Sequence, residues 1–162
     1  MRLLVLAAGR RDPFEAQSAD YLKRAEATGR ALGISGVSLK TIEAPRAMSG
    51  AVRQAKETEL FLAALPDRAR VVLLDETGKD RPSRALAGLV AAEQASGAPD
   101  LVFLIGGADG FDDALHQAVK PRLAGTLAFG RATWPHMMVR LMLAEQLYRA
   151  TTILSGHPYH RD

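Results

Sequence analysis

The chain has 162 residues, 48% of them hydrophobic and 24% charged, which is typical of one folded domain and excludes a disordered or collagen-like protein. It contains no cysteine, which excludes disulfides, thiolate metal sites and a cysteine nucleophile and fits a reducing, cytoplasmic location. The formal net charge is +3 and 16 of the 21 cationic residues are arginine, which favours phosphate-bearing partners, although the base composition of a genome can produce the same bias.

The first predicted element is a buried strand at residues 2–8, because this run is almost entirely apolar. The run is too short for a signal peptide, and no other apolar stretch approaches the roughly 20 residues that span a bilayer. We therefore expect neither secretion nor a membrane partner. A helix should follow, since Asp12 can cap it, Pro13 can take its first position and Glu15 can complete a capping box.

The later elements continue to alternate between strands and helices. Apolar runs predict strands at residues 37–42, 71–74, 101–105 and 123–129, and apolar residues at helical spacing predict helices at 50–65, around 86–90, at 115–119 and at 135–150. This order predicts an α/β fold, with an open, mostly parallel sheet and helices on both faces, in a single domain covering residues 1–162.

Ligands of such sheets bind beyond the carboxyl ends of the strands. This rule selects three candidate places, the turns at 74–78 and 106–110 and the loop at 130–135. Gly106, Gly107 and Gly110 let a ligand approach the backbone, but the turn carries neither a Walker loop nor a dinucleotide-binding fingerprint. A tight turn that binds nothing is the alternative.

The side chains at these three places each have two interpretations. Trp134 offers a flat apolar wall for a planar ligand, or it fills the core. Asp75 and Glu76 offer paired carboxylates, or they belong to a solvated turn. A serine hydrolase is not favoured, because the chain has no Gly-x-Ser-x-Gly elbow.

The last predicted helix carries an apolar stripe at Val139, Met142, Leu143 and Leu147, which fits core packing or an adaptable interface. On its surface, Glu145 and Arg149 are four residues apart and should pair.

The tail that follows this helix concentrates polar side chains. His157, Tyr159, His160 and Arg161 can stack on bases, bind phosphate and exchange protons near neutral pH. We expect no metal, because Pro158 disturbs the spacing of the two histidines and no third ligand is evident.

Three segments together resemble a known family. They are Leu-Ile-Gly-Gly-Ala-Asp-Gly at 104–110, the Trp-Pro-His to Tyr-Arg-Ala run at 134–150, and the closing His-Pro-Tyr-His-Arg. They are similar to the bacterial 23S ribosomal RNA pseudouridine N3-methyltransferases, small members of the SPOUT superfamily, and the resemblance covers the whole chain. The sequence departs from the commoner pattern at Asp109, where glutamate is frequent, and at Met137 and Met138.

The resemblance implies a C-terminal trefoil knot that forms a pocket for S-adenosylmethionine, and a homodimer in which each pocket is completed by the other subunit. It implies that ten residues bind this cofactor: Leu74, Gly106, Gly107, Gly110, Gly130, Arg131, Ala132, Thr133, Trp134 and Pro135. The implied substrate is a pseudouridine in the helix 69 loop of 23S rRNA on the assembled ribosome. We expect His157, Tyr159, His160 and Arg161 to contact this RNA.

Methylation at N3 needs alignment of donor and acceptor and loss of the N3 proton. His160 is the candidate for that proton, although water could take it, and Arg140 and Arg161 are expected to steer phosphate or the developing negative charge. If contacts to RNA phosphates provide most of the affinity, binding of the protein to RNA should weaken as the salt concentration rises.

Three alternatives remain open at this point. One is a related SPOUT methyltransferase that acts on tRNA, and mapping of methylated nucleotides would separate it. Another is a non-catalytic ribosome-binding module of the same fold, which would not consume S-adenosylmethionine. The third is a flavodoxin-like nucleotide binder, which the missing phosphate loop disfavours.

Overall fold

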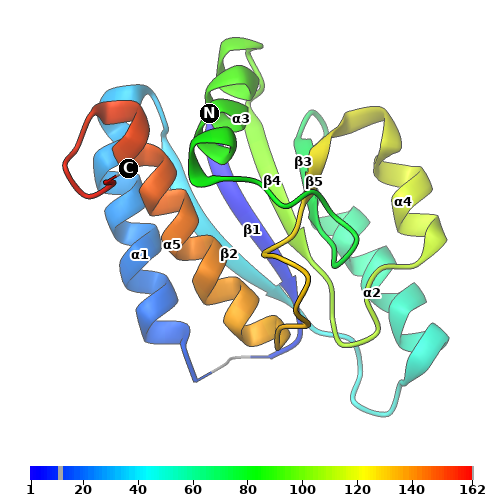
Figure 1. Cartoon of the computed structure of the whole chain (residues 1–162). Helices are drawn as coiled ribbons and strands as arrows, with labels where there is room; N and C mark the ends of the chain where they lie inside the picture. Colours follow the sequence, from blue (N-terminus) through cyan, green and yellow to red (C-terminus); the bar gives the residue numbers. More distant parts are fainter. Residues whose placement is uncertain (11–12, 162) are drawn as a thin grey trace.

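A parallel sheet of five strands forms the centre of the computed structural model, which describes residues 1–10 and 13–161 (Figure 1). The strands are β1 (Arg2–Ala8), β2 (Gly36–Ile42), β3 (Arg70–Leu74), β4 (Asp100–Ile105) and β5 (Leu123–Leu127). Their order across the sheet is β2-β1-β4-β3-β5, and all neighbouring pairs are parallel. The predicted α/β fold with a parallel sheet is confirmed.

Helices cover both faces of the sheet. In chain order the α-helices of the described residues are α1 (Glu15–Gly29), α2 (Gly50–Ala64), α3 (Ser83–Ala95), α4 (Asp113–Val119) and α5 (His136–Ser155), with short 3₁₀ turns at Arg30–Leu32 and Lys120–Arg122. Buried residues of α1, α3 and α5 share one core cluster, and those of α2 and α4 share another. Figure 1 accordingly shows α1 and α5 on one side of the sheet and α2 and α4 on the other.

The central strand, β4, explains why both clusters form. All six of its residues are buried, and alternate side chains point to opposite faces. Leu101, Phe103 and Ile105 belong to the cluster under α1, α3 and α5, whereas Val102 and Leu104 belong to the cluster under α2 and α4. A strand covered on both faces is mostly apolar, as the continuous run at 101–105 predicted. The exception is Asp100 at the start of β4, which is buried and accepts hydrogen bonds from the guanidinium of Arg2.

The start of the first helix differs from the prediction. Phe14 has φ −104° and ψ 12°, outside the helical region, so α1 begins at Glu15 and Pro13 is not its first residue. The proposed cap, Asp12, lies outside the described residues.

Two later boundaries also differ. β5 ends at Leu127, two residues earlier than predicted, and the carbonyl of Phe129 accepts a hydrogen bond from the indole of Trp134. α5 extends to Ser155, where Gly156 adopts the left-handed conformation with φ +69° and ends the helix. None of the described helices combines the length and the apolarity that a membrane crossing needs.

Candidate functional site

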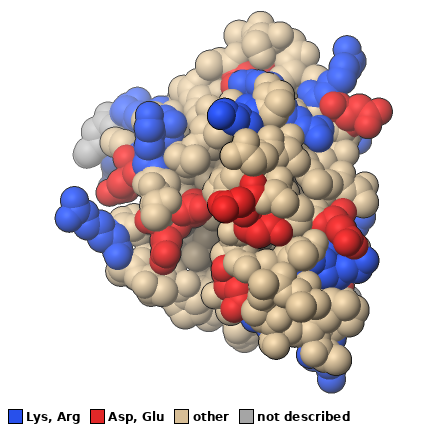
Figure 2. All heavy atoms as spheres, turned by 90° about the vertical axis from the view of Figure 1, so that its right-hand side faces the viewer, with Lys and Arg blue, Asp and Glu red and all other residues tan. Residues whose placement is uncertain are grey.

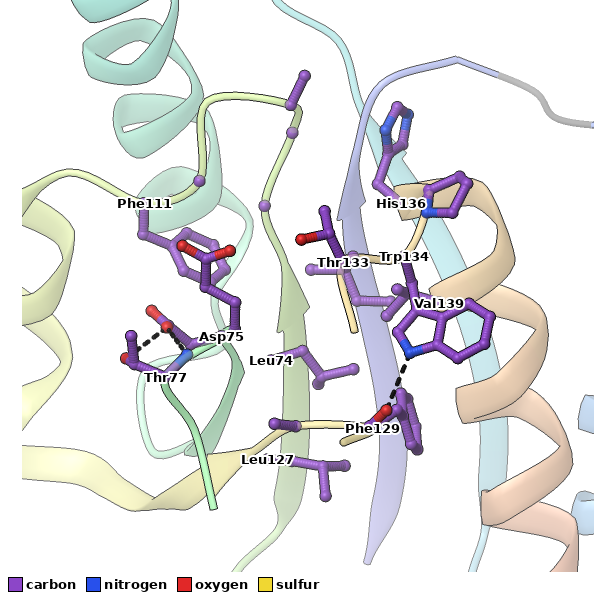
Figure 3. Close-up of a pocket in the computed structure, with 18 of the residues that line it drawn as sticks. Leu74, Asp75, Thr77, Phe111, Leu127, Phe129, Thr133, Trp134, His136 and Val139 are labelled. Carbon is purple, nitrogen blue, oxygen red and sulfur yellow. Dashed lines mark hydrogen bonds between the residues drawn. The ribbon is translucent and has the colours of Figure 1, made fainter. Parts of the chain in front are cut away.

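A cavity of about 790 Å³ lies at the carboxyl ends of β3, β4 and β5 (Figure 3). Parallel strands bring their carboxyl ends to one edge of the sheet, so the three predicted places meet there. Nine of the ten residues expected to bind a cofactor line this cavity: Leu74, Gly106, Gly107, Gly110, Gly130, Ala132, Thr133, Trp134 and Pro135. Arg131 is exposed and is not among the lining residues.

The glycine turn after β4 needs its glycines. A Cβ at Gly106 would lie 3.2 Å from the backbone carbon of Gly110, and a Cβ at Gly107 would lie 2.9 Å from the carboxylate of Glu57. Gly110 has φ +70°, which favours glycine. The turn therefore brings bare backbone to the cavity wall.

Helix α2 holds this turn from behind. The buried Glu57 accepts a hydrogen bond from the backbone N–H of Gly107. Arg53 Nε donates to Asp109 at 2.9 Å, and the side chain of Gln54 donates to the backbone carbonyl of Asp109. Burial raises the pKa of Glu57, and the nearby Arg53 guanidinium lowers that pKa to a smaller extent.

The turn after β3 brings carboxylates to the cavity. Asp75 accepts hydrogen bonds from the backbone N–H of Thr77 at 2.8 Å and from its hydroxyl at 2.7 Å, which fixes the turn (Figure 3). His116 Nε2 lies 3.7 Å from the other oxygen of Asp75. One Asp75 oxygen is thus committed to the turn, and Glu76 also lines the cavity.

Trp134 forms an apolar wall of the cavity. Its side chain is 40% exposed, so the alternative that it fills the core is wrong. The indole Nε1 donates to the carbonyl of Phe129 at 2.9 Å, and Val139 and Leu127 line the same cavity (Figure 3). A flat aromatic surface and apolar side chains suit a planar ring of a ligand.

The charged side chains among the described lining residues of the cavity are acidic. Its described lining residues include three carboxylates, those of Asp75, Glu76 and Asp109, and no lysine or arginine. Figure 2 shows the side of the molecule that carries α2 and α4, where acidic side chains gather at the centre and basic ones lie mostly toward the edges. The cavity thus suits a ligand that carries positive charge, and the acidic side chains at the centre of this face disfavour phosphate there.

The C-terminal tail lies far from the cavity of its own chain. Helix α5 begins at the cavity with His136 and continues for 20 residues, a rise of about 30 Å, before the tail starts. Figure 1 shows the tail beside α1, at the opposite end of α5. Within one chain, His157, Tyr159, His160 and Arg161 are therefore not brought to the cavity.

The tail packs on α5 through a polar and aromatic cluster. The hydroxyl of Tyr159 donates to Glu145 at 3.0 Å, and its ring lies 4.5 Å from that of Tyr148. Arg149 stacks over the Tyr159 ring at 4.8 Å and approaches His160 Nδ1 at 3.4 Å. Burial and the Glu145 carboxylate raise the pKa of Tyr159 well above its ordinary value. The predicted pair of Glu145 and Arg149 is confirmed at 2.5 Å.

Arg140 is buried, with 1% of its surface exposed. Its guanidinium donates to the carbonyl of Ala8 at 2.5 Å and to that of Arg10 at 2.6 Å. A Cβ at Gly9 would lie 3.2 Å from this guanidinium. Arg140 therefore supports the backbone after β1 and offers no surface to phosphate in the single chain.

Sequence reasoning missed some residues of the site. Val139 and Phe111 line the cavity. The sequence assigns Val139 to the apolar stripe of the last helix and not to the site, and Phe111 directly follows the turn at 106–110. Glu57 gave no signal, because it lies among other polar residues in the middle of a helix. Among the described residues, no three histidine, aspartate or glutamate side chains are grouped so that they could hold a metal ion.

The parallel sheet and the cavity at its carboxyl edge define an α/β protein with a site for a small ligand. A family described as "Predicted SPOUT methyltransferase" matches residues 1–160, and the chain belongs to this family. It is 46% identical over 164 residues to "Ribosomal RNA large subunit methyltransferase H" of Methylocella silvestris, and the match covers 100% of both chains. Proteins of the same name from Bradyrhizobium diazoefficiens and Methylorubrum extorquens are each 45% identical, with 99% of this chain and 99% and 97% of theirs covered.

Proposed function

We propose that the protein is an S-adenosylmethionine-dependent methyltransferase of large-subunit ribosomal RNA. Its target in this proposal is N3 of a pseudouridine in the helix 69 loop of 23S rRNA, on the assembled ribosome in the cytoplasm. The names of its full-length relatives support the class of substrate, and the segments at 104–110, 134–150 and 157–161 support the particular nucleotide. The observation that carries the proposal is the cavity at the carboxyl edge of the sheet.

The cavity residues fit S-adenosylmethionine. The volume of the cavity lies within the range of small-molecule sites, roughly 300–1,000 Å³. Trp134 and Val139 suit the adenine ring, the backbone at Gly106 and Gly107 suits its polar edge, and the carboxylates of Asp75 and Glu76 suit a cationic donor. When bound, the cofactor supplies a methyl group on a positively charged sulfur.

A trefoil knot is part of the proposal. β5 lies at one edge of the sheet next to β3, whereas α5 packs against α1 and α3, so the loop at 128–135 must carry the chain across the carboxyl edge. Threading of this loop and α5 past the 106–110 turn would form the knot. An experimental structure in which the chain passes outside that turn would contradict it.

We also propose a homodimer, because the tail cannot reach the cavity of its own chain. A second chain packed antiparallel along α5 would bring its tail to the cavity of the first. In that arrangement the second chain's His160 accepts the N3 proton, its Arg161 contacts the RNA and its Tyr159 and His157 lie at the RNA surface. Arg140 acts as a positioning residue, since it holds residues 8–10 rather than touching the substrate.

The decisive experiment combines purified protein, ribosomes and labelled S-adenosylmethionine, followed by mass spectrometry of 23S rRNA. We expect one added methyl group on one pseudouridine in the helix 69 loop. Methyl transfer to tRNA alone would identify a different substrate. Binding to ribosomes without methyl transfer would identify a non-catalytic module.

The role of His160 is tested by single-turnover methylation with the His160→Ala variant. We expect slower methyl transfer with an unchanged affinity for the cofactor. Full methylation at the normal rate would show that water or another group takes the proton. Loss of ribosome binding would instead assign His160 to recognition.

A further inference from the structure

A second cavity of about 420 Å³ adjoins the first one. Gly107, Ala108 and His136 line both cavities, so they form a shared wall. The other residues of the second cavity come from the end of β1, from the segment between β2 and α2, and from α2 itself. Group transfer between two substrates requires two adjoining spaces, and this wall is where the two spaces meet.

The residues of the shared wall have close neighbours on two sides. Glu57 is buried behind the wall and accepts the N–H of Gly107, and Arg53 and Gln54 bind Asp109 in the same turn. On the other side, a Cβ at Gly9 would lie 3.2 Å from both Arg140 Nη2 and His136 Nε2, so the backbone of Gly9 packs closely on these side chains.

The charges of the two cavities differ. The first has no lysine or arginine among its described lining residues, whereas the second has Arg10, Arg46 and Arg53. Arg53 is paired with Asp109 and also offsets the carboxylate of Glu57. Arg10 and Arg46 are exposed, and apart from Glu57 the described lining residues of this cavity include one carboxylate, that of Glu43. The second cavity therefore has an excess of positive charge, in a form that suits phosphate.

We propose that the second cavity binds the acceptor nucleotide of the RNA, with Arg10 and Arg46 on its phosphate and the base against Gly107 and Ala108. This inference rests on the proposed function, which supplies an RNA acceptor and a methyl donor in the first cavity. The size of the second cavity lies in the range of small-molecule sites.

The first test needs no enzymatic activity. The full-length protein is saturated with S-adenosylhomocysteine and titrated with uridine 5′-monophosphate, while the backbone amides are followed by NMR. We expect saturable shifts at Gly9, Gly107 and Ala108, with weaker shifts for uridine, which lacks the phosphate. Absence of saturable shifts at these three amides, or shifts confined to the loop at 130–135, would overturn the proposal.

The second test compares Arg10→Gln/Arg46→Gln with Arg68→Gln, a matched control at an exposed arginine before β3. We expect the double variant to bind uridine 5′-monophosphate about tenfold more weakly and to lose about tenfold in kcat/KM for ribosomes, at an unchanged cofactor affinity. The control should match the unmodified protein. An unchanged kcat/KM in the double variant would overturn the assignment.

The two proposals can fail separately. Nucleotide binding in the second cavity without methyl transfer to rRNA would remove the proposed function and leave the binding site. Methylation of 23S rRNA by a protein whose second cavity binds no nucleotide would support the proposed function and remove the second cavity as the acceptor site.

Discussion

Glu57 shows how much a single buried side chain can contribute to this site. It lies on α2, outside every segment that the sequence singled out, yet it holds Gly107 on the wall between the two cavities. The groups that face it are the Arg53 guanidinium, the Asp109 carboxylate and the N–H of Gly107. Its environment therefore makes the stability of the protein depend on pH.

Because burial raises the pKa of Glu57 above its ordinary value of 4.5, the folded protein binds this proton more tightly than the unfolded chain. The stabilisation from the protonated form is complete below pH 4.5 and is lost as the pH rises through the folded-state pKa. Relative to Glu57→Gln, the unmodified protein should thus lose free energy of unfolding as the pH rises from 4.5. Urea denaturation at several pH values measures this difference, and Glu59→Gln on the exposed face of α2 is the control. If the difference in free energy of unfolding between the unmodified protein and Glu57→Gln did not vary with pH, this prediction would be wrong.

Trp134 carries the apolar wall, so Trp134→Ala should weaken binding of S-adenosylhomocysteine about tenfold, whereas Trp134→Phe should retain most of the affinity. Both variants lose the hydrogen bond to Phe129. The comparison therefore separates loss of the aromatic surface from loss of the loop contact. Isothermal titration calorimetry gives the dissociation constants, and circular dichroism checks the fold. Equal affinities for all three proteins would remove Trp134 from the site.

At the scale of elements, the apolar pattern predicted the strands and helices well because each is buried on a defined face. β4 is predicted by its unbroken apolar run, and α2 by the helical spacing of its apolar residues. The ends were harder, because they depend on contacts between distant residues. The end of β5 depends on Phe129 receiving the Trp134 indole, and the sequence does not reveal that partner.

The sequence also predicted part of the candidate site. Its three loops follow from the rule for parallel strands, and the tail was singled out by its composition. The burial of Arg140 was not predictable, because its partners, the carbonyls of Ala8 and Arg10, are more than 100 residues away in the chain. The separation of the tail from the cavity depends on where α5 ends, and this end was predicted five residues too early.

The docking of the tail on α5 gives a prediction for that element. Glu145→Ala removes the acceptor of the Tyr159 hydroxyl and the partner of Arg149. We expect faster hydrogen exchange at residues 157–161 and lower methylation of ribosomes, with cofactor affinity unchanged. Glu26→Ala, which breaks the similar i,i+4 pair between α1 and Arg30 in the 3₁₀ turn that follows it, is the control. Exchange that stays equally slow in both variants would show that other contacts hold the tail.

At the scale of the whole molecule, the distance between the cavity and the tail makes the proposed dimer testable by complementation. A His160→Ala chain lacks a working tail but keeps its cavity. A Gly106→Val chain keeps its tail but has a disturbed cavity, because a Cβ at Gly106 would lie 3.2 Å from the backbone of Gly110. The Gly106→Val variant alone should be inactive, and the His160→Ala variant alone should show only its slow methyl transfer. Equal amounts, mixed under conditions that allow subunits to exchange, should regain about a quarter of the normal activity, since half of the dimers are mixed and each has one intact site.

Mixing that restores no activity, although mass spectrometry shows mixed dimers, would mean that cavity and tail do not cooperate between chains. The control is a mixture of two separately prepared His160→Ala samples, which should stay at the slow rate of that variant.

The length of α5 has a last consequence, for the way activity depends on the amount of protein. If one subunit holds the donor and the other supplies the tail, a lone subunit is inert. Specific activity should then fall when the protein is diluted below the dissociation constant of the pair, and it should rise again on concentration. In a cell, halving the copy number near that constant would reduce modification by more than half.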